Sequence, residues 1–215
     1  MKGLFQKDIY NLIQQGKSLL YIFVIFVVVF VSQGKADFFV PMWITMCIML
    51  VTTSMSLDGI AKWDTYALTM PVTRTELVVS KYILGICLTL FGVLSSFCVL
   101  IGSNFILKNI EWKEALILLG VASGIGLFYL SIILPLLFKF GVEKARIFMM
   151  MGYLVPFIFI YGIAFLAKNS QIPIPEEAVI EEFLTKGIVM FPVIGLLCLG
   201  VSIWISIRIF QKIDK

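Results

Sequence analysis

The sequence predicts an all-α integral membrane protein with six transmembrane helices and an N-terminal interfacial amphipathic helix. The first reason is composition: of 215 residues, 60% are apolar and only 14% are charged, which soluble domains rarely show. The second is length, because a bilayer-spanning helix needs ~20 apolar residues and six would use about 120, leaving only short connections. We therefore expect a single transmembrane domain over residues 1–215.

The third reason is the order of the apolar runs along the chain. Ahead of the first run, residues 1–17 place Leu4, Ile9 and Leu12 on one helical face, which is typical of a helix lying in the membrane interface. Between the last two runs, residues 167–186 are more polar, and Pro175 is placed to begin a short interfacial helix there. The six runs are 18–33, 38–57, 82–107, 114–138, 147–166 and 187–207.

The distribution of basic residues predicts the orientation of these spans. With both termini in the cytoplasm, the inner segments contain 12 lysines and arginines and the outer segments contain 5. Such an excess on the inner side is the usual rule for membrane proteins. We therefore expect two cytoplasmic loops, 58–81 and 139–146, and an extracellular loop at 167–186.

The residue types also exclude several kinds of chemistry. The chain has no histidine, which rules out histidine-ligated zinc and serine–histidine or cysteine–histidine catalysis. It has no phosphate-binding P-loop motif, and its spans contain essentially no ionisable residue, which disfavours a proton-coupled transporter or an ion channel. We expect no catalytic residue, cofactor or metal on this chain and no nucleic-acid partner. The four cysteines lie in apolar stretches and are interpreted as buried thiols.

The loop at 58–81 has the clearest local signals. Ile60, Trp63, Ala67 and Met70 recur at helical spacing with Tyr66 beside them, and Pro71 should end that helix at or before Met70. A second helix then begins with a capping box, in which Thr73 is the N-cap and Glu76 the third helical residue, and with Val72 and Leu77 placed as a hydrophobic staple. Local physics leaves two interpretations open: a connector anchored at the membrane surface by its aromatic residues, or a docking surface for a partner.

This segment resembles a family signature. The run Asp58, Trp63, Tyr66 and Met70-Pro-Val-Thr-Arg-Thr-Glu76, ending at Ser80-Lys-Tyr82, is similar to that of ABC-2-type permeases, the membrane subunits of ATP-binding cassette exporters. A second similar segment is Pro135–Arg146. The size, the number of spans and the N-terminal helix agree with the type V exporter-like permease fold. The subgroup it most resembles exports phenol-soluble modulins or antimicrobial peptides from bacteria.

The resemblance implies partners and contact residues. The chain would lie in the bacterial plasma membrane as a homodimer or a related heterodimer, with two copies of a separate ATPase that binds ATP and magnesium. Trp63 and Tyr66 would fill a groove of that ATPase, charged residues would pair at its rim, and Pro71 would set the angle of the coupling helix. The implied contacts are Asp58, Lys62, Trp63, Asp64, Tyr66, Met70, Pro71, Arg74 and Glu76, with Lys139, Glu143, Lys144 and Arg146 from the second loop.

An apolar route with scattered hydroxyl groups suits an amphipathic peptide better than a small ion. Gly120 and Gly124 are spaced for close approach of another helix, within the chain or across a dimer. Three alternatives stay open: an autonomous channel, a secondary transporter, or a self-protection pump for lipids, drugs or incoming bacteriocins. The possible pathway residues are Thr52, Thr53, Ser95, Ser96, Tyr153 and Phe157, although hydroxyl groups in spans more often bond neighbouring helices.

Overall fold

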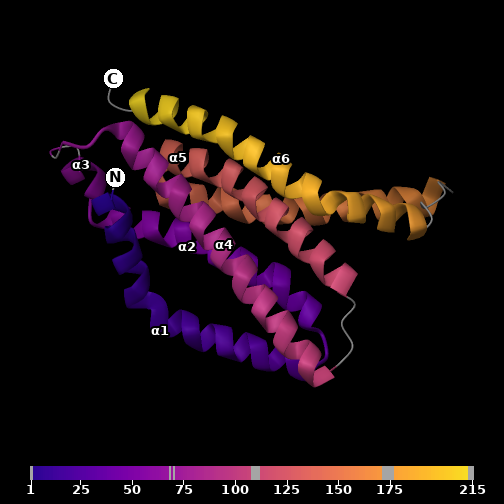
Figure 1. Cartoon of the computed structure of the whole chain (residues 1–215). Helices are drawn as coiled ribbons and strands as arrows, with labels where there is room; N and C mark the ends of the chain where they lie inside the picture. The colour runs from indigo at the N-terminus through magenta and orange to yellow at the C-terminus, as the bar shows by residue number, and fades with distance from the viewer. Residues whose placement is uncertain (1, 68, 70, 108–111, 171–176, 213–215) are drawn as a thin grey trace.

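Helices form all the regular structure in the described part of the chain (Figure 1). The computed structural model describes residues 2–67, 69, 71–107, 112–170 and 177–212. Side chains are described there except at positions 2, 15, 64, 65, 106, 107, 143, 145–170 and 177–189. The helices are α1 (Lys2–Ser32), α2 (Ala36–Ile60), α3 (Trp63–Ala67), α4 (Arg74–Leu107), α5 (Trp112–Ser170) and α6 (Glu177–Lys212).

Four helical segments within the described residues are long and apolar enough to cross a membrane. They are Ala36–Ile60, Arg74–Phe105, Trp112–Val142 and Met190–Lys212, and they coincide with four of the six predicted runs. The bent pair Gly3–Gln14 and Gly16–Ser32 would make a fifth. The run at 147–166 is helical but its side chains lie outside the described residues, so the sixth span stays a prediction. The protein is therefore a multi-pass membrane protein.

Helix α1 bends sharply near its middle. Its first limb (Gly3–Gln14) meets its second limb (Gly16–Ser32) at 59°. Within the first limb, Leu4, Asp8 and Leu12 are buried against the protein, whereas Ile9 and Ile13 are exposed. The interfacial position predicted for residues 1–17 stays a prediction, but a separate helical limb is present there.

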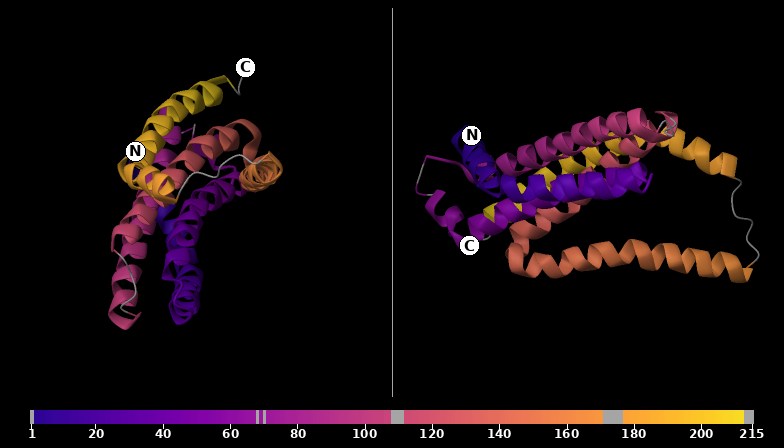
Figure 2. Two further views of the ribbon diagram at one scale, coloured as in Figure 1. Left: turned by 90° about the vertical axis from the view of Figure 1, so that its right-hand side faces the viewer. Right: turned by 90° about the horizontal axis from the view of Figure 1, so that it is seen from below.

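The chain folds back at Gly141, inside the segment expected to be the second cytoplasmic loop. Gly141 has φ 74° and ψ 168°, a conformation that glycine adopts readily, and helix α5 continues on both sides of it. Figure 2 shows the two parts of α5 running in opposite directions. Segment 139–146 is thus a glycine break between two helices where the sequence indicated a loop.

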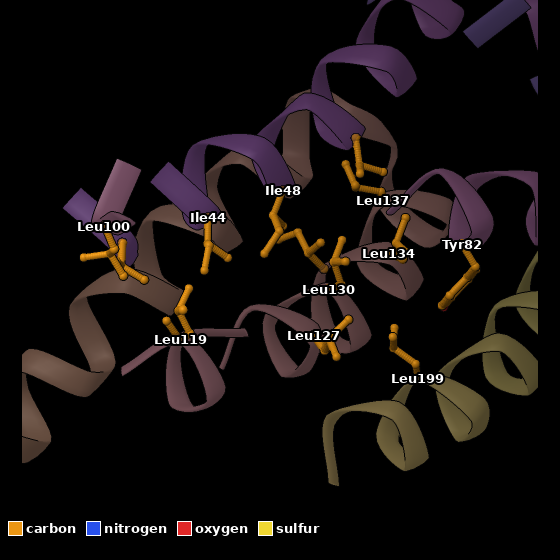
Figure 3. Packing of buried hydrophobic residues seen from close by; sticks show 14 of the residues in the cluster. Ile44, Ile48, Tyr82, Leu100, Leu119, Leu127, Leu130, Leu134, Leu137 and Leu199 are labelled. Atoms are coloured by element: carbon orange, nitrogen blue, oxygen red, sulfur yellow. The ribbon is translucent and has the colours of Figure 1, made fainter. Parts of the chain in front are cut away.

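The main core lies where α2, α4, α5 and α6 meet. Ile48 of α2, Leu134 of α5 and Leu199 of α6 pack together there with Tyr82 of α4 (Figure 3). The Tyr82 hydroxyl lies 2.6 Å from Ser202 Oγ and 2.7 Å from Ser206 Oγ, which links α4 to α6 inside the apolar core. Hydroxyl bonds of this kind hold membrane helices together where apolar contacts give little preference.

Glycines allow α5 and α6 to approach closely. A Cβ atom added at Gly124 would lie 2.5 Å from the backbone carbonyl carbon of Phe191, and one at Gly195 would lie 2.8 Å from Leu127 Cβ. Of the two alternatives left open for Gly124, the structure shows close approach within one chain. These contacts fix α6 against the first part of α5.

Candidate functional site

Several charged residues lie at one end of the bundle. The N-terminus, α3 and the C-terminus all lie at this end (Figure 1). We call it the charged end and define it by residues 3–14, 58–81 and 206–212. The connection between α2 and α4, which the sequence singled out, crosses it.

Helix α3 is shorter than the sequence predicted. Ile60 was expected to start it, but Ile60 ends α2 and α3 begins at Trp63. The break is at Lys62, whose φ of 49° is left-handed and cannot continue a helix. Ile60, Trp63 and Ala67 therefore belong to two helices and do not share one helical face. Of the three, only Ala67 is fully buried, while Ile60 is 80% exposed.

The start of α4 has the predicted capping box. Thr73 N–H donates to Glu76 Oε2 at 2.9 Å, and Glu76 N–H donates to Thr73 Oγ1 at 3.3 Å. The staple also forms, because Val72 packs against a small apolar cluster that contains Leu77. The α4 end of the turn after α3 is therefore fixed by local contacts.

One face of α3 is anchored to α1. Ala67 is buried together with Leu4 of α1 and Leu77 of α4, and Trp63 packs against them. Lys7 Nζ lies 4.5 Å from the centre of a Trp63 ring, in a cation–π contact. Trp63 therefore points toward the protein's own first limb, and its predicted insertion into a partner groove stays untested.

Several residues in and around α3 are exposed. Tyr66 is 57% exposed, Ile60 is 80% exposed, and Lys62 and Pro71 are exposed as well. The ring of Tyr66 lies 5.6 Å from that of Trp63. Ile60 and Tyr66 thus leave apolar and aromatic surface exposed beside the anchored Trp63 and Ala67.

A buried cluster of charges lies directly beneath α3, and sequence reasoning missed it. Lys81 Nζ lies 2.8 Å from Asp8 Oδ1, 2.6 Å from Asp58 Oδ2 and 2.9 Å from Ser54 Oγ. Lys7 pairs with Asp58 and lies 3.1 Å from Asp8 Oδ1. We call Lys7, Asp8, Asp58 and Lys81, with Ser54, the charge cluster.

The charge cluster is neutral overall and almost closed to solvent. Asp8 is 1% exposed, Asp58 5% and Lys81 7%, and the pair of cations balances the pair of anions. Buried charges are stable only when paired, so each of these side chains fixes the positions of the others. The cluster therefore joins α1, α2 and α4 just behind α3.

Two sequence signals could have suggested the charge cluster. Asp8 lies between Leu4 and Leu12 at helical spacing, so a carboxylate interrupts a buried face, and Ser54 and Asp58 are one turn apart on α2. A cavity of about 20 Å³ touches Lys7, Asp58 and Lys81. That volume is enough for one water molecule.

Arg74 contacts the end of α6. Its Nη1 donates to the Phe210 carbonyl oxygen at 3.1 Å, and its guanidinium carbon lies 5.9 Å from the Phe210 ring centre. A cation near the last carbonyls of a helix is favourable because it satisfies groups without a helical partner. Arg74 therefore holds the start of α4 against the end of α6.

The remaining predicted contact residues divide into two groups. Lys139 and Lys144 are exposed near the Gly141 break, with Lys139 Nζ 4.9 Å from the Phe140 ring centre. The side chains of Asp64, Glu143 and Arg146, and residue Met70 as a whole, lie outside the described residues.

Three of the candidate pathway hydroxyls bond to carbonyl oxygens of their own helices. Thr52 and Thr53 of α2 donate to the Met49 carbonyl oxygen at 2.7 and 3.3 Å. Ser95 of α4 donates to Phe91 O at 2.7 Å and accepts a bond from Trp43 Nε1, also at 2.7 Å. Ser96 is fully buried. The side chains of Tyr153 and Phe157 lie outside the described residues, and a pathway through these positions stays a prediction.

Comparison with known proteins identifies the family. The family model described as ABC-2 family transporter protein matches residues 3–211, which is nearly the whole chain. No curated protein and no solved structure gives a significant match. The match covers α1, the α2–α4 connection and the end of α6 alike. The chain therefore belongs to the ABC-2 transporter family.

Proposed function

We propose that this protein is the permease subunit of an ATP-driven exporter and that it moves amphipathic peptides with energy from a separate ATPase. Membership of the ABC-2 permease family implies pairing with an ATP-binding cassette ATPase. Two ATPase copies would bind a pair of permease chains, both termini would be cytoplasmic, and no reaction would occur on this chain. ATP and magnesium would bind to the ATPase.

The observation that supports this proposal most directly is the combination of anchored and exposed residues in the connection between α2 and α4. It is fixed by Ala67 and by the contact of Trp63 with Lys7, while Tyr66, Ile60 and Lys62 are open to a partner. A short helix that is held by buried contacts and also exposes an aromatic side chain is well suited to transmit a partner's movement. This exposed surface would dock onto the ATPase.

The charge cluster would pass that movement into the membrane. Asp58 lies on α2 just before α3, and it pairs with Lys7 on α1 and Lys81 on α4. Because an unpaired buried charge is costly, these three helices would move together when α3 is displaced. Asp58 is 5% exposed, so its contribution to coupling would be indirect.

The cargo proposal depends on the character of the spans. Apart from the charge cluster at one end, their described interior is apolar with a few hydroxyls, and those of Thr52, Thr53 and Ser95 already bond within their own helices. Such a surface offers little to a hydrated ion, whereas an amphipathic peptide could lay its apolar side against it. Export is the direction proposed, and protection against incoming peptides would use the same route.

The coupling proposal is tested by removing the exposed apolar side chains of the connection between α2 and α4 and leaving the anchoring residues Trp63 and Ala67 in place. The tagged protein is purified in mild detergent from its native host, co-eluting proteins are identified by mass spectrometry, and ATPase activity is measured with amphipathic peptides. For the double variant Ile60→Ser, Tyr66→Ala we expect at least a tenfold decrease in the amount of co-purified ATPase and in the peptide-stimulated ATPase activity.

The matched control is Tyr21→Ala on the second limb of α1, because Tyr21 is 67% exposed and far from α3 in sequence. It should retain both properties. Equal ATPase recovery and stimulation in the double variant and the control would reject the coupling assignment. Peptide flux in vesicles without any ATPase would favour an autonomous channel.

A further inference from the structure

An apolar cavity of about 290 Å³ lies between α1, α2 and α4, away from the charge cluster. One wall is the face of the second limb of α1 that runs from Gly16 to Phe23, and the others are Trp43 of α2 with Phe91 and Ser95 of α4. The first lining residue, Gly16, lies where α1 bends by 59°. Figure 1 shows this bend of α1. Its volume is close to that of a small ligand pocket, about 300 Å³ at the lower end.

The few polar atoms at this cavity are already satisfied. Trp43 Nε1 donates to Ser95 Oγ, and the Ser95 hydroxyl donates in turn to the Phe91 carbonyl, both at 2.7 Å. Phe23 packs edge-on against Trp43 with ring centres 4.7 Å apart, so the base of the cavity is rigid and aromatic. A ligand here would gain no new hydrogen bond, which favours a plain hydrocarbon chain over a peptide with its polar backbone.

One cation is next in sequence to a residue that lines the cavity. Lys17 follows Gly16 directly and is the single charged residue of α1 after Asp8. It is exposed, and no acidic side chain pairs with it in the part of the chain that the structure describes. A lysine at the end of an apolar helix face reaches toward the head-group region, where an anionic group would neutralise it.

We propose that this cavity binds one acyl chain of an anionic phospholipid whose head group pairs with Lys17. The hydrocarbon walls select the chain and the lysine selects the charge of the head group. The proposal does not depend on an ATPase or on any cargo, so it can fail while the proposed transport function stands, or the reverse.

The test uses Trp43 as a reporter inside the cavity. Trp63, Trp112 and Trp204 are replaced by Phe, and the single-tryptophan protein is placed in phosphatidylcholine vesicles. Brominated acyl chains quench tryptophan fluorescence on contact, so brominated phosphatidylglycerol and brominated phosphatidylcholine are added in turn at low mole fraction. We expect half-maximal quenching at a several-fold lower fraction of the anionic lipid.

Two further variants separate the chain from the head group. Gly16→Leu should fill the cavity, because a Cβ there meets no atom within 4 Å, and should abolish the excess quenching. Gly102→Leu adds the same side chain at an equally open position outside the cavity lining and should leave the quenching intact. Lys17→Gln should remove the preference for the anionic lipid while quenching by the neutral lipid persists.

Defined results would overturn the proposal. Equal quenching by both lipids that Gly16→Leu does not change would show that Trp43 meets only bulk bilayer. Relief of quenching by an added amphipathic peptide, and not by unbrominated phosphatidylglycerol, would assign the cavity to cargo. If the triple replacement does not fold, the same titration is made on the otherwise native protein, and the quenched component must disappear with Trp43→Phe.

Discussion

Replacing Lys81 with methionine tests whether the charge cluster holds the charged end together. Lys81 is 7% exposed and contacts Asp8, Asp58 and Ser54, at 2.8, 2.6 and 2.9 Å. Without it, the two buried carboxylates would share Lys7 alone, whose side chain is 22% exposed. An uncompensated buried charge lowers the free energy of unfolding by about 3–5 kcal/mol. We therefore expect Lys81→Met to lower the melting temperature clearly in detergent.

A second substitution separates charge balance from the loss of a side chain. Adding Asp8→Asn to Lys81→Met leaves Lys7 paired with Asp58 and restores neutrality, so part of the lost stability should return. The control Lys212→Met removes an exposed lysine at the same end. It should lower the free energy of unfolding by only about 0–1 kcal/mol. The reasoning fails if Lys81→Met and Lys212→Met melt alike, or if Asp8→Asn lowers the melting temperature of Lys81→Met further.

Three other substitutions have definite expected outcomes in the same thermal assay. Thr73→Ala removes the N-cap of α4 and should lower the free energy of unfolding by about 1 kcal/mol. An unchanged melting temperature would mean that the cap does not stabilise the protein. Gly124→Ala would place a Cβ 2.5 Å from the backbone of Phe191, so it should destabilise strongly, whereas Gly102→Ala meets no atom within 4 Å and should not. Tyr82→Phe removes the hydroxyl that bonds two serines of α6 and should lower the free energy of unfolding by about 0.6–1.7 kcal/mol. An unchanged melting temperature would contradict a stabilising role for these hydrogen bonds.

Features set by neighbouring residues could be predicted from the sequence. The structure confirms three predictions that depend on spacings of a few residues. They are the capping box at Thr73, the end of a helix before Pro71 and four of the apolar runs. The predicted start of α3 was wrong because Lys62 has a left-handed backbone conformation that breaks the helix. A periodic pattern of apolar residues does not reveal a single unusual φ value.

Features that depend on distant residues could not be predicted. The pairing of Asp8 with Lys81 joins positions 73 residues apart, and the bond from Arg74 to the Phe210 carbonyl spans 136. Counting basic residues placed Lys81 on the inner side but could not show that it is buried. Likewise the cysteines were interpreted as buried, yet Cys87 and Cys98 are exposed, because lipid-facing and core positions of a span are equally apolar.

The neutrality of the charge cluster has an electrical consequence. Moving one elementary charge across a membrane potential involves about 2.3 kcal/mol per 100 mV. Lys7, Asp8, Asp58 and Lys81 sum to zero, so displacing them as a unit along the membrane normal requires no net electrical work. A conformational cycle built on this cluster would run at the same rate in energised and de-energised membranes, whereas a variant with one of the four charges removed would become sensitive to voltage.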